Sequence, residues 1–159
     1  MSSQDRDSGF TMIELLVTIS LLGLMMVIAV SGWTSWAKAS RQSGTARELL
    51  SVMRQAQVRA VTEGRPICVS FRVVENDYTL YRGTCDDTAK VRVIGPVVSD
   101  SKDVKLTAPS FTGPAGSSTG VTFNARGTAW PGSVRLTRTG SSKSYTLTVE
   151  GLTGRVSLS

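Results

Sequence analysis

The chain has 159 residues, of which 40% are apolar, and it carries 18 Lys and Arg against 12 Asp and Glu. This length fits one domain with a core of its own, and the basic balance suits anionic partners such as nucleic acid or a membrane surface. The sequence contains no histidine, which excludes Ser-His and Cys-His nucleophilic pairs and makes a zinc site unexpected. We therefore expect a protein that is not an enzyme, with no cofactor and no bound metal.

The first predicted element is a membrane-spanning helix over residues 10–30, a largely apolar run whose one charge is Glu14. A helix of this length rises about 30 Å, the thickness of the hydrocarbon core of a bilayer. Residues 1–9 form a short polar leader ahead of it. Trp33 and Trp36 follow the apolar run closely, where they serve either as interfacial anchors or as contacts between the helix and a globular domain.

Glu14 is costly in such a helix, because insertion scales assign an acid at mid-membrane roughly 2.5–3.5 kcal/mol. Acids inside a membrane usually have a partner. If the chain were cut after Gly9, Phe10 would carry a free ammonium group, one helical turn from Glu14. We therefore expect Glu14 of one subunit to neutralise the Phe10 amine of a neighbouring subunit in an assembly of related helices.

The helix is expected to continue through residues 31–64, because proline is absent between Phe10 and Arg65. Residues of an amphipathic stripe recur there at spacings of three and four: Ala46, Leu49, Leu50, Met53, Ala56, Gln57 and Ala60. Gly64-Arg65-Pro66 is typical of a helix stop. We predict one helix from about Phe10 to about Glu63, whose second half packs on a globular domain.

Residues 65–159 are predicted to form a β-rich domain whose strands are separated by Gly-rich turns. The expected strands are Ile67–Val74, Tyr78–Arg82, Val91–Ile94, Val104–Thr107, Val121–Phe123, Ser133–Arg138, Ser144–Val149 and Arg155–Leu158. Residues 109–120 are rich in Gly, Pro, Ser and Thr and are predicted to be a loop. A helix followed by antiparallel strands predicts an α+β fold.

Two sets of side chains in this domain bear on disulfide and metal chemistry. Cys68 and Cys85 flank the first predicted hairpin, and in an exported domain they are expected to form a disulfide. Asp86-Asp87, and Asp100 with Asp103, offer oxygen ligands for calcium, but neither pair shows the spaced pattern of a calcium-binding loop. We expect these acids to be solvated.

The segment from Val104 to Ser159 contains six basic residues and a single acid, Glu150. Strand alternation places Val134, Leu136, Tyr145, Leu147, Val149, Val156 and Leu158 inward and leaves Arg, Thr and Ser outward. Guanidinium and hydroxyl groups bind phosphate oxygens without reading bases. The residues expected to contact double-stranded DNA are Arg126, Arg135, Arg138, Lys143 and Arg155. The alternative interpretation is a solvated basic face.

The N-terminal residues follow a definite order: a polar leader ending in Gly9, then Phe10-Thr11-x-x-Glu14, then an apolar helix. In this pattern the chain resembles the type IV pilin and pseudopilin superfamily. The resemblance implies a pilin-like fold, cleavage after Gly9 by a prepilin peptidase, methylation of the Phe10 amine, and assembly directed by Glu14. It also implies a single-pass protein of the cytoplasmic membrane, with its C-terminal domain outside the cytoplasm and later on a pilus or the cell surface.

Three further motifs, Gly64-Arg65-Pro66, Val121–Gly127 and Gly154-Arg155-Val156, resemble the FimT/GspH branch of minor pilins and pseudopilins. FimT-like pilins are implicated in DNA uptake during natural transformation, and a C-terminal Gly-Arg-x-Arg motif in them contacts DNA. Gly154 and Arg155 match that motif, whereas Ser157 stands in place of the second arginine. GspH-like pseudopilins instead sit near the tip of the type II secretion pseudopilus and bind other minor subunits.

These patterns leave three functions open. The first is a minor type IV pilin that joins or primes a pilus, with DNA capture as an added role. The second is a pseudopilin at the tip of a type II secretion pseudopilus, without a DNA function. The third is a membrane-anchored binding module that never polymerises. The expected partners are other pilins or pseudopilins, a prepilin peptidase, the membrane and, in the first case, double-stranded DNA.

Overall fold

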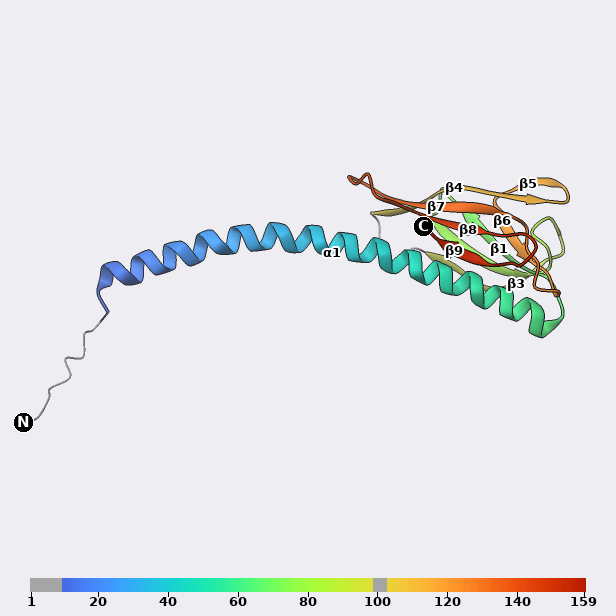
Figure 1. The fold of residues 1–159 in the computed structure, drawn as a ribbon, viewed down its shortest axis with the longest axis horizontal. Helices are drawn as coiled ribbons and strands as arrows, with labels where there is room; N and C mark the ends of the chain where they lie inside the picture. Colours follow the sequence, from blue (N-terminus) through green and yellow to red (C-terminus); the bar gives the residue numbers. More distant parts are fainter. Residues whose placement is uncertain (1–9, 99–102) are drawn as a thin grey trace, which may run out of the picture. The chain divides into compact units, whose positions relative to one another are not determined.

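The computed structural model describes residues 10–98 and 103–159, apart from the side chains of residues 30 and 31. The described part contains the helix α1 (Met12–Glu63) and a series of strands (Figure 1). The strands are β1 (Ile67–Arg72), β2 (Asp77–Arg82), β3 (Val91–Val98), β4 (Val104–Gly113), β5 (Gly116–Ser118), β6 (Gly120–Phe123), β7 (Gly132–Arg138), β8 (Ser144–Val149) and β9 (Val156–Leu158). The chain divides between Lys38 and Ala39 into two compact units.

The strands of the second unit form two antiparallel sheets. The order is β3-β2-β1-β6 in the four-stranded sheet and β5-β4-β7-β8-β9 in the five-stranded sheet. The predicted first hairpin is present, with Ile67 opposite Arg82 and Arg72 opposite Asp77. In the five-stranded sheet, β7 and β8 pair from Gly132–Val149 to Thr137–Ser144. The expected α+β architecture is confirmed.

A single buried cluster combines residues from α1 and from both sheets. From α1 it takes the small and apolar side chains of the predicted stripe, Ala46, Leu49, Met53, Ala56 and Ala60. Five of the seven side chains expected to point inward from β7, β8 and β9 are buried, and Tyr145 and Leu158 are half-buried against the same cluster. The periodicity of 3.6 in the helix and 2 in the strands therefore identified most of this core.

The helix ends where the sequence predicted. Gly64 has a φ of 62°, the left-handed conformation that glycine adopts at little cost. The Arg65 N–H donates to the Ala60 carbonyl (3.2 Å) and the Gly64 N–H to the Val61 carbonyl (3.3 Å), the paired bonds of a Schellman motif. Just inside this cap, Glu63 forms ion pairs with Arg59 and with Arg82 of β2. These contacts join the end of the helix to the sheet.

The prediction of a loop over residues 109–120 is wrong. β4 extends to Gly113 and pairs with β5, with Phe111 opposite Ser118. Phe111 is 1% exposed and stacks on Phe71 with ring centroids 5.9 Å apart. The content of Gly, Pro, Ser and Thr predicted a loop, but the burial of one aromatic side chain removes more apolar area from water than the small polar residues around it expose. β3 is also longer than expected, since it continues past Ile94 to Val98.

Candidate functional site

The first turn of α1 carries the residues expected to direct processing and assembly. Phe10 is 77% exposed, and among the described residues the Glu14 carboxylate has no ion-pair partner. Gly9 lies outside the described residues, so cleavage there remains a prediction. The carboxylate of Glu14 occupies the first turn, where the positive end of the helix dipole favours a negative charge.

Thr11 begins this helix, a role that the sequence analysis missed. The Glu14 N–H lies 3.3 Å from Thr11 Oγ1, which accepts its hydrogen bond. Thr followed three residues later by Glu is the spacing of a capping box, and this signal was available in the sequence. Thr11 therefore fixes the point at which the helix starts and so the turn on which Glu14 lies.

The apolar half of α1 is exposed along its whole described length. Every large apolar side chain from Met12 to Ile28 is at least 52% exposed. The two polar residues within it, Thr18 and Ser20, donate to the carbonyls of Leu15 (2.9 Å) and Leu16 (2.8 Å). A helix whose hydroxyl groups bond to its own backbone while its apolar side chains are exposed suits lipid or the helices of neighbouring subunits.

Three arginines of the β-rich unit lie on or next to two adjoining turns. Arg126 lies in the β6–β7 connection and Arg155 in the β8–β9 turn, and both are exposed. A Cβ on Gly154 would lie 2.2 Å from the Gly127 carbonyl oxygen, so the two turns are in contact. Gln57 Nε2 donates to the Gly127 (3.2 Å) and Thr153 (3.0 Å) carbonyls and ties both turns to α1.

Arg54 is the third member of this group, and it was not among the DNA contacts predicted from the sequence. Its Nη2 lies 3.5 Å from the carbonyl oxygen of Val156, the residue that follows Arg155. We call Arg54, Arg126 and Arg155 the arginine end. Arg54 precedes Arg155 by about a hundred residues, so only the packing of α1 beside β9 could reveal it.

The other expected DNA contacts lie elsewhere in the domain. Lys143 is exposed beyond β7, with its Nζ 5.2 Å from the ring centroid of Tyr145, and its carbonyl accepts a hydrogen bond from Gln42. Fifteen residues of helix separate Gln42 from Gln57, about 22 Å of rise. Arg138 follows buried Val134 and Leu136 on the inner side of β7, is half-buried, and its Nε has no hydrogen-bond partner among the described residues.

Arg135 lies between these ends on the outer face of the five-stranded sheet. Its cross-strand neighbours are Thr107 on β4 and Thr146 on β8. The adjoining row pairs Lys105 with Thr137 and Thr137 with Ser144. All of the Arg, Thr and Ser positions predicted to point outward are exposed or half-buried: Arg135, Thr137, Thr146, Thr148, Arg155 and Ser157. This face thus presents two cations among hydroxyl groups, with no acid in either row.

A protein-family model decides which family the chain represents. Residues 45–153 match the model described as type II transport protein GspH. The chain belongs to the GspH family. Residues 4–30 match a second model, the prokaryotic N-terminal methylation motif, so the expected resemblance to pilins and pseudopilins is confirmed. No curated protein matches this GspH-family chain significantly.

Solved structures with the same fold include pilins and pseudopilins. The minor pseudopilin EpsH of the type 2 secretion system of Vibrio cholerae aligns with a TM-score of 0.57 at 12% identity, over 74% of this chain and 94% of that one. The type IV minor pilin FimU of Pseudomonas aeruginosa aligns with a TM-score of 0.55 at 16% identity, over 78% and 92%. GspH of E. coli gives 0.51 at 18% identity, over 76% and 88%. The fold is therefore pilin-like, and the chain is a GspH-type minor pilin or pseudopilin.

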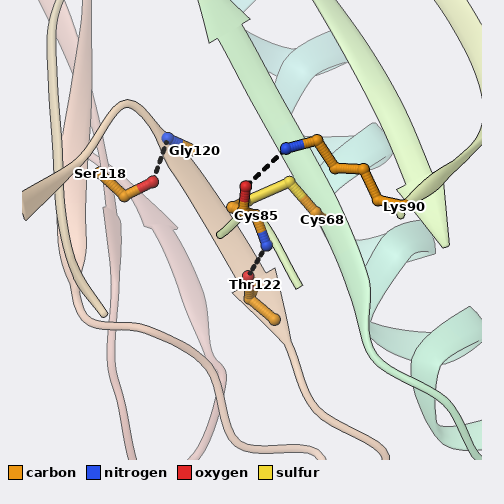
Figure 2. The surroundings of a disulfide bond; sticks show 6 residues. All are labelled: Cys68, Cys85, Lys90, Ser118, Gly120 and Thr122. Atoms are coloured by element: carbon orange, nitrogen blue, oxygen red, sulfur yellow. Dashed lines mark hydrogen bonds between the residues drawn. A yellow bond between two sulfur atoms is a disulfide. The ribbon is translucent and has the colours of Figure 1, made fainter. Parts of the chain in front are cut away.

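In this GspH-family domain Cys68 and Cys85 form the expected disulfide, with Cα atoms 5.0 Å apart (Figure 2). The Cys85 N–H donates to Thr122 Oγ1 (2.9 Å), and Lys90 Nζ donates to the Cys85 carbonyl (2.6 Å). A Cβ on Gly120 would lie 2.7 Å from Cys85 Sγ, so glycine leaves the space for the bridge. The bridge holds the connection between β2 and β3 against the four-stranded sheet. Its role is structural.

Acidic side chains do not gather into a metal site in the part of the chain that the structure describes. Asp87 Oδ1 accepts the Ala89 N–H (2.8 Å), the local turn contact of an exposed acid. Asp100 lies outside the described residues.

Proposed function

We propose that this protein is a minor pilin that is cleaved after Gly9 by a prepilin peptidase, methylated on Phe10, and incorporated into a type IV pilus through Glu14. The match of residues 4–30 to the N-terminal methylation motif carries this proposal. The exposed apolar half of α1 supports it, because that surface requires lipid before assembly and neighbouring helices afterwards. Before assembly the subunit is held in the cytoplasmic membrane with its β-rich unit outside the cytoplasm.

Substitution of Glu14 tests this function. Glu14→Ala and Glu14→Gln are expected to be processed and inserted normally but to be lost from sheared filaments, because the neighbouring Phe10 amine then has no counter-charge. Glu48→Gln, which removes an exposed acid from the second half of α1, is the matched control and should be incorporated normally. Normal incorporation of both Glu14 variants would contradict assembly through this residue and favour a membrane-anchored module.

The arginine end and the outer face of the five-stranded sheet support a second, finer role in binding double-stranded DNA. Arg126, Arg135 and Arg155 are exposed, and Arg54 lies beside Arg155. Such a surface contacts phosphates rather than base edges, so binding would be independent of sequence and sensitive to salt. Arg138 contributes least in this proposal, because its side chain is half-buried. Lys143 bonds through its carbonyl to Gln42, about 22 Å of helical rise from Gln57, and would contact a separate phosphate.

A titration of the full chain in neutral detergent with duplex DNA, repeated across a salt series, tests this role. Arg155→Gln and Arg126→Gln are each expected to weaken binding to all sequences and to lower the salt slope by about 1. Arg92→Gln removes the same charge from exposed β3 on the other sheet and should change neither quantity. Absence of binding at low salt would contradict the DNA role and leave the alternative, a pseudopilin at the tip of a type II secretion pseudopilus, whose partners crosslinking would identify.

A further inference from the structure

Two exposed tryptophans mark the end of the apolar half of α1. Trp33 and Trp36 are 69% and 64% exposed, and their ring centroids are 5.5 Å apart. Their spacing of three residues places them on one side of the helix. The third tryptophan, Trp130, is only 7% exposed in the β-rich unit. A paired indole surface of this size on a helix that also exposes its apolar side chains requires a partner.

The surroundings of the pair match one kind of partner. Lys38 and Arg41 follow it directly and are exposed, whereas the preceding residues back to Glu14 carry no charge. Indole rings favour the boundary between lipid tails and head groups, and basic side chains beyond them favour the head groups themselves. We propose that Trp33 and Trp36 lie in the outer head-group layer of the membrane and set the depth of the anchor. This inference rests on the membrane anchoring in the proposed function.

The helical rise then gives the depth of Glu14. Nineteen residues separate Glu14 from Trp33 and twenty-two separate it from Trp36, which correspond to about 28 and 33 Å of helix. The hydrocarbon core is about 30 Å thick. With the tryptophans in the outer head-group layer, Glu14 lies at the inner boundary of the hydrocarbon and not in its middle. The carboxylate is therefore hydrated in the unassembled subunit, within reach of water and lipid amines.

At this depth, the free-energy cost of burying the Glu14 carboxylate arises during assembly and not in the unassembled subunit. An acid at the boundary costs far less than one at mid-membrane, because the penalty depends on depth. Outward movement of the subunit into a filament carries Glu14 into an apolar environment, and only then does it require the Phe10 amine of a neighbour. The tryptophan pair opposes this movement until filament contacts replace its lipid contacts. It acts as a positioning element for Glu14.

Thiol labelling of the full chain in phosphatidylethanolamine–phosphatidylglycerol nanodiscs tests the depth. The native cysteines are bridged, so a single new cysteine reports its own exposure to a membrane-impermeant maleimide. Ile13→Cys reports the level of Glu14 with the acid intact, Leu22→Cys the middle of the anchor, and Ser35→Cys the outer boundary. We expect Ile13→Cys and Ser35→Cys to react at least tenfold faster than Leu22→Cys. Protection of Ile13→Cys equal to that of Leu22→Cys would overturn the inference, whereas equally fast reaction at all three positions would overturn the membrane anchoring itself.

The tryptophans are tested directly in the same nanodiscs. Lipids brominated near the head group should quench the tryptophan emission more than lipids brominated at the tail ends, and Trp33→Phe with Trp36→Phe should abolish the difference. Trp130, buried in the domain, supplies an unquenched internal signal. Replacing both anchor tryptophans by alanine should change the labelling rate of Ile13→Cys severalfold. Stronger quenching by deep bromines, or an unchanged Ile13→Cys rate in that variant, would overturn the positioning role.

Discussion

At Gly154 the backbone has a φ of 62° and approaches the Gly127 carbonyl so closely that a Cβ would lie 2.2 Å from it. The two residues of the C-terminal Gly154-Arg155 pair thus have different roles. The glycine lets the β8–β9 turn pack on the β6–β7 connection and on Gln57, and the arginine projects from the turn so formed. Loss of the glycine is expected to displace Arg155 as well as to destabilise the domain.

Gly154→Ala is expected to destabilise the domain by more than the strain of a left-handed alanine, which is about 1–2 kcal/mol. The matched control is Gly140→Ala, because Gly140 has a φ of 76° but open space around its Cβ position, so it reports the strain alone. Urea unfolding of the two variants measures the difference. Equal losses of stability would show that the close approach to Gly127 is relieved at no cost.

Glu63 gives the end of α1 a dependence on pH. Hydrogen bonds from Arg59 and then Arg82 hold the pKa of its carboxyl below the usual range, so the folded state favours the ionised form. Stabilisation by this group is complete above the unfolded pKa of about 4.3 and is lost as the pH falls through the lower folded value. Glu63→Gln should therefore lower the unfolding midpoint at pH 7 and match the unchanged protein in strong acid. Glu75→Gln, an exposed turn acid, should show a smaller difference at pH 7.

Among the helices and strands, those with a clear pattern along the sequence were predicted, and the β4–β5 hairpin, which has no such pattern, was not. α1 was recognised because its pattern repeats over many residues, and the β1–β2 hairpin because two strand-forming runs flank the turn-rich residues 75–77. The β4–β5 hairpin was missed because only one large side chain in it, Phe111, is buried. Its packing also depends on Gly113, where a Cβ would lie 2.7 Å from the Trp130 ring. Such a site is defined by a distant side chain, so no local pattern in the sequence reveals it.

The disulfide restrains the connection between β2 and β3, which buries little of its own surface. Residues 83–90 of this connection contribute no fully buried side chain, and the two cysteines are 17 residues apart in the sequence. In the chain-entropy model a loop of this size stabilises by about 3 kcal/mol. Replacing both Cys68 and Cys85 by serine should cost about that amount in urea unfolding, and adding a strong reductant to the unchanged protein should give a comparable loss. Reductant should leave the serine variant unaffected.

In the molecule as a whole, the two compact units differ in how much apolar surface they expose. The first exposes nearly all of its described apolar side chains, while the second buries most of its own in one cluster. Changes in the first unit are therefore expected to affect membrane depth and assembly, and changes in the second to affect stability and ligand binding. Consistently, the Glu14→Ala variant should retain the unfolding midpoint of the β-rich unit.

Features that depend on local order along the chain could be predicted from the amino-acid sequence: the N-terminal motif, the apolar anchor, the amphipathic stripe, the helix stop and the alternation of β7, β8 and β9. These are repeats or adjacent residues, and their physical meaning does not require knowledge of the fold. Contacts between distant residues follow from the packing of the folded chain. This packing places Arg54 against the Val156 carbonyl next to Arg155, joins Gly127 to Gly154 through Gln57, leaves Arg138 half-buried, and gives Phe111 its core position. Packing of the helix against two sheets creates these contacts, and they join residues tens of positions apart that no spacing rule connects.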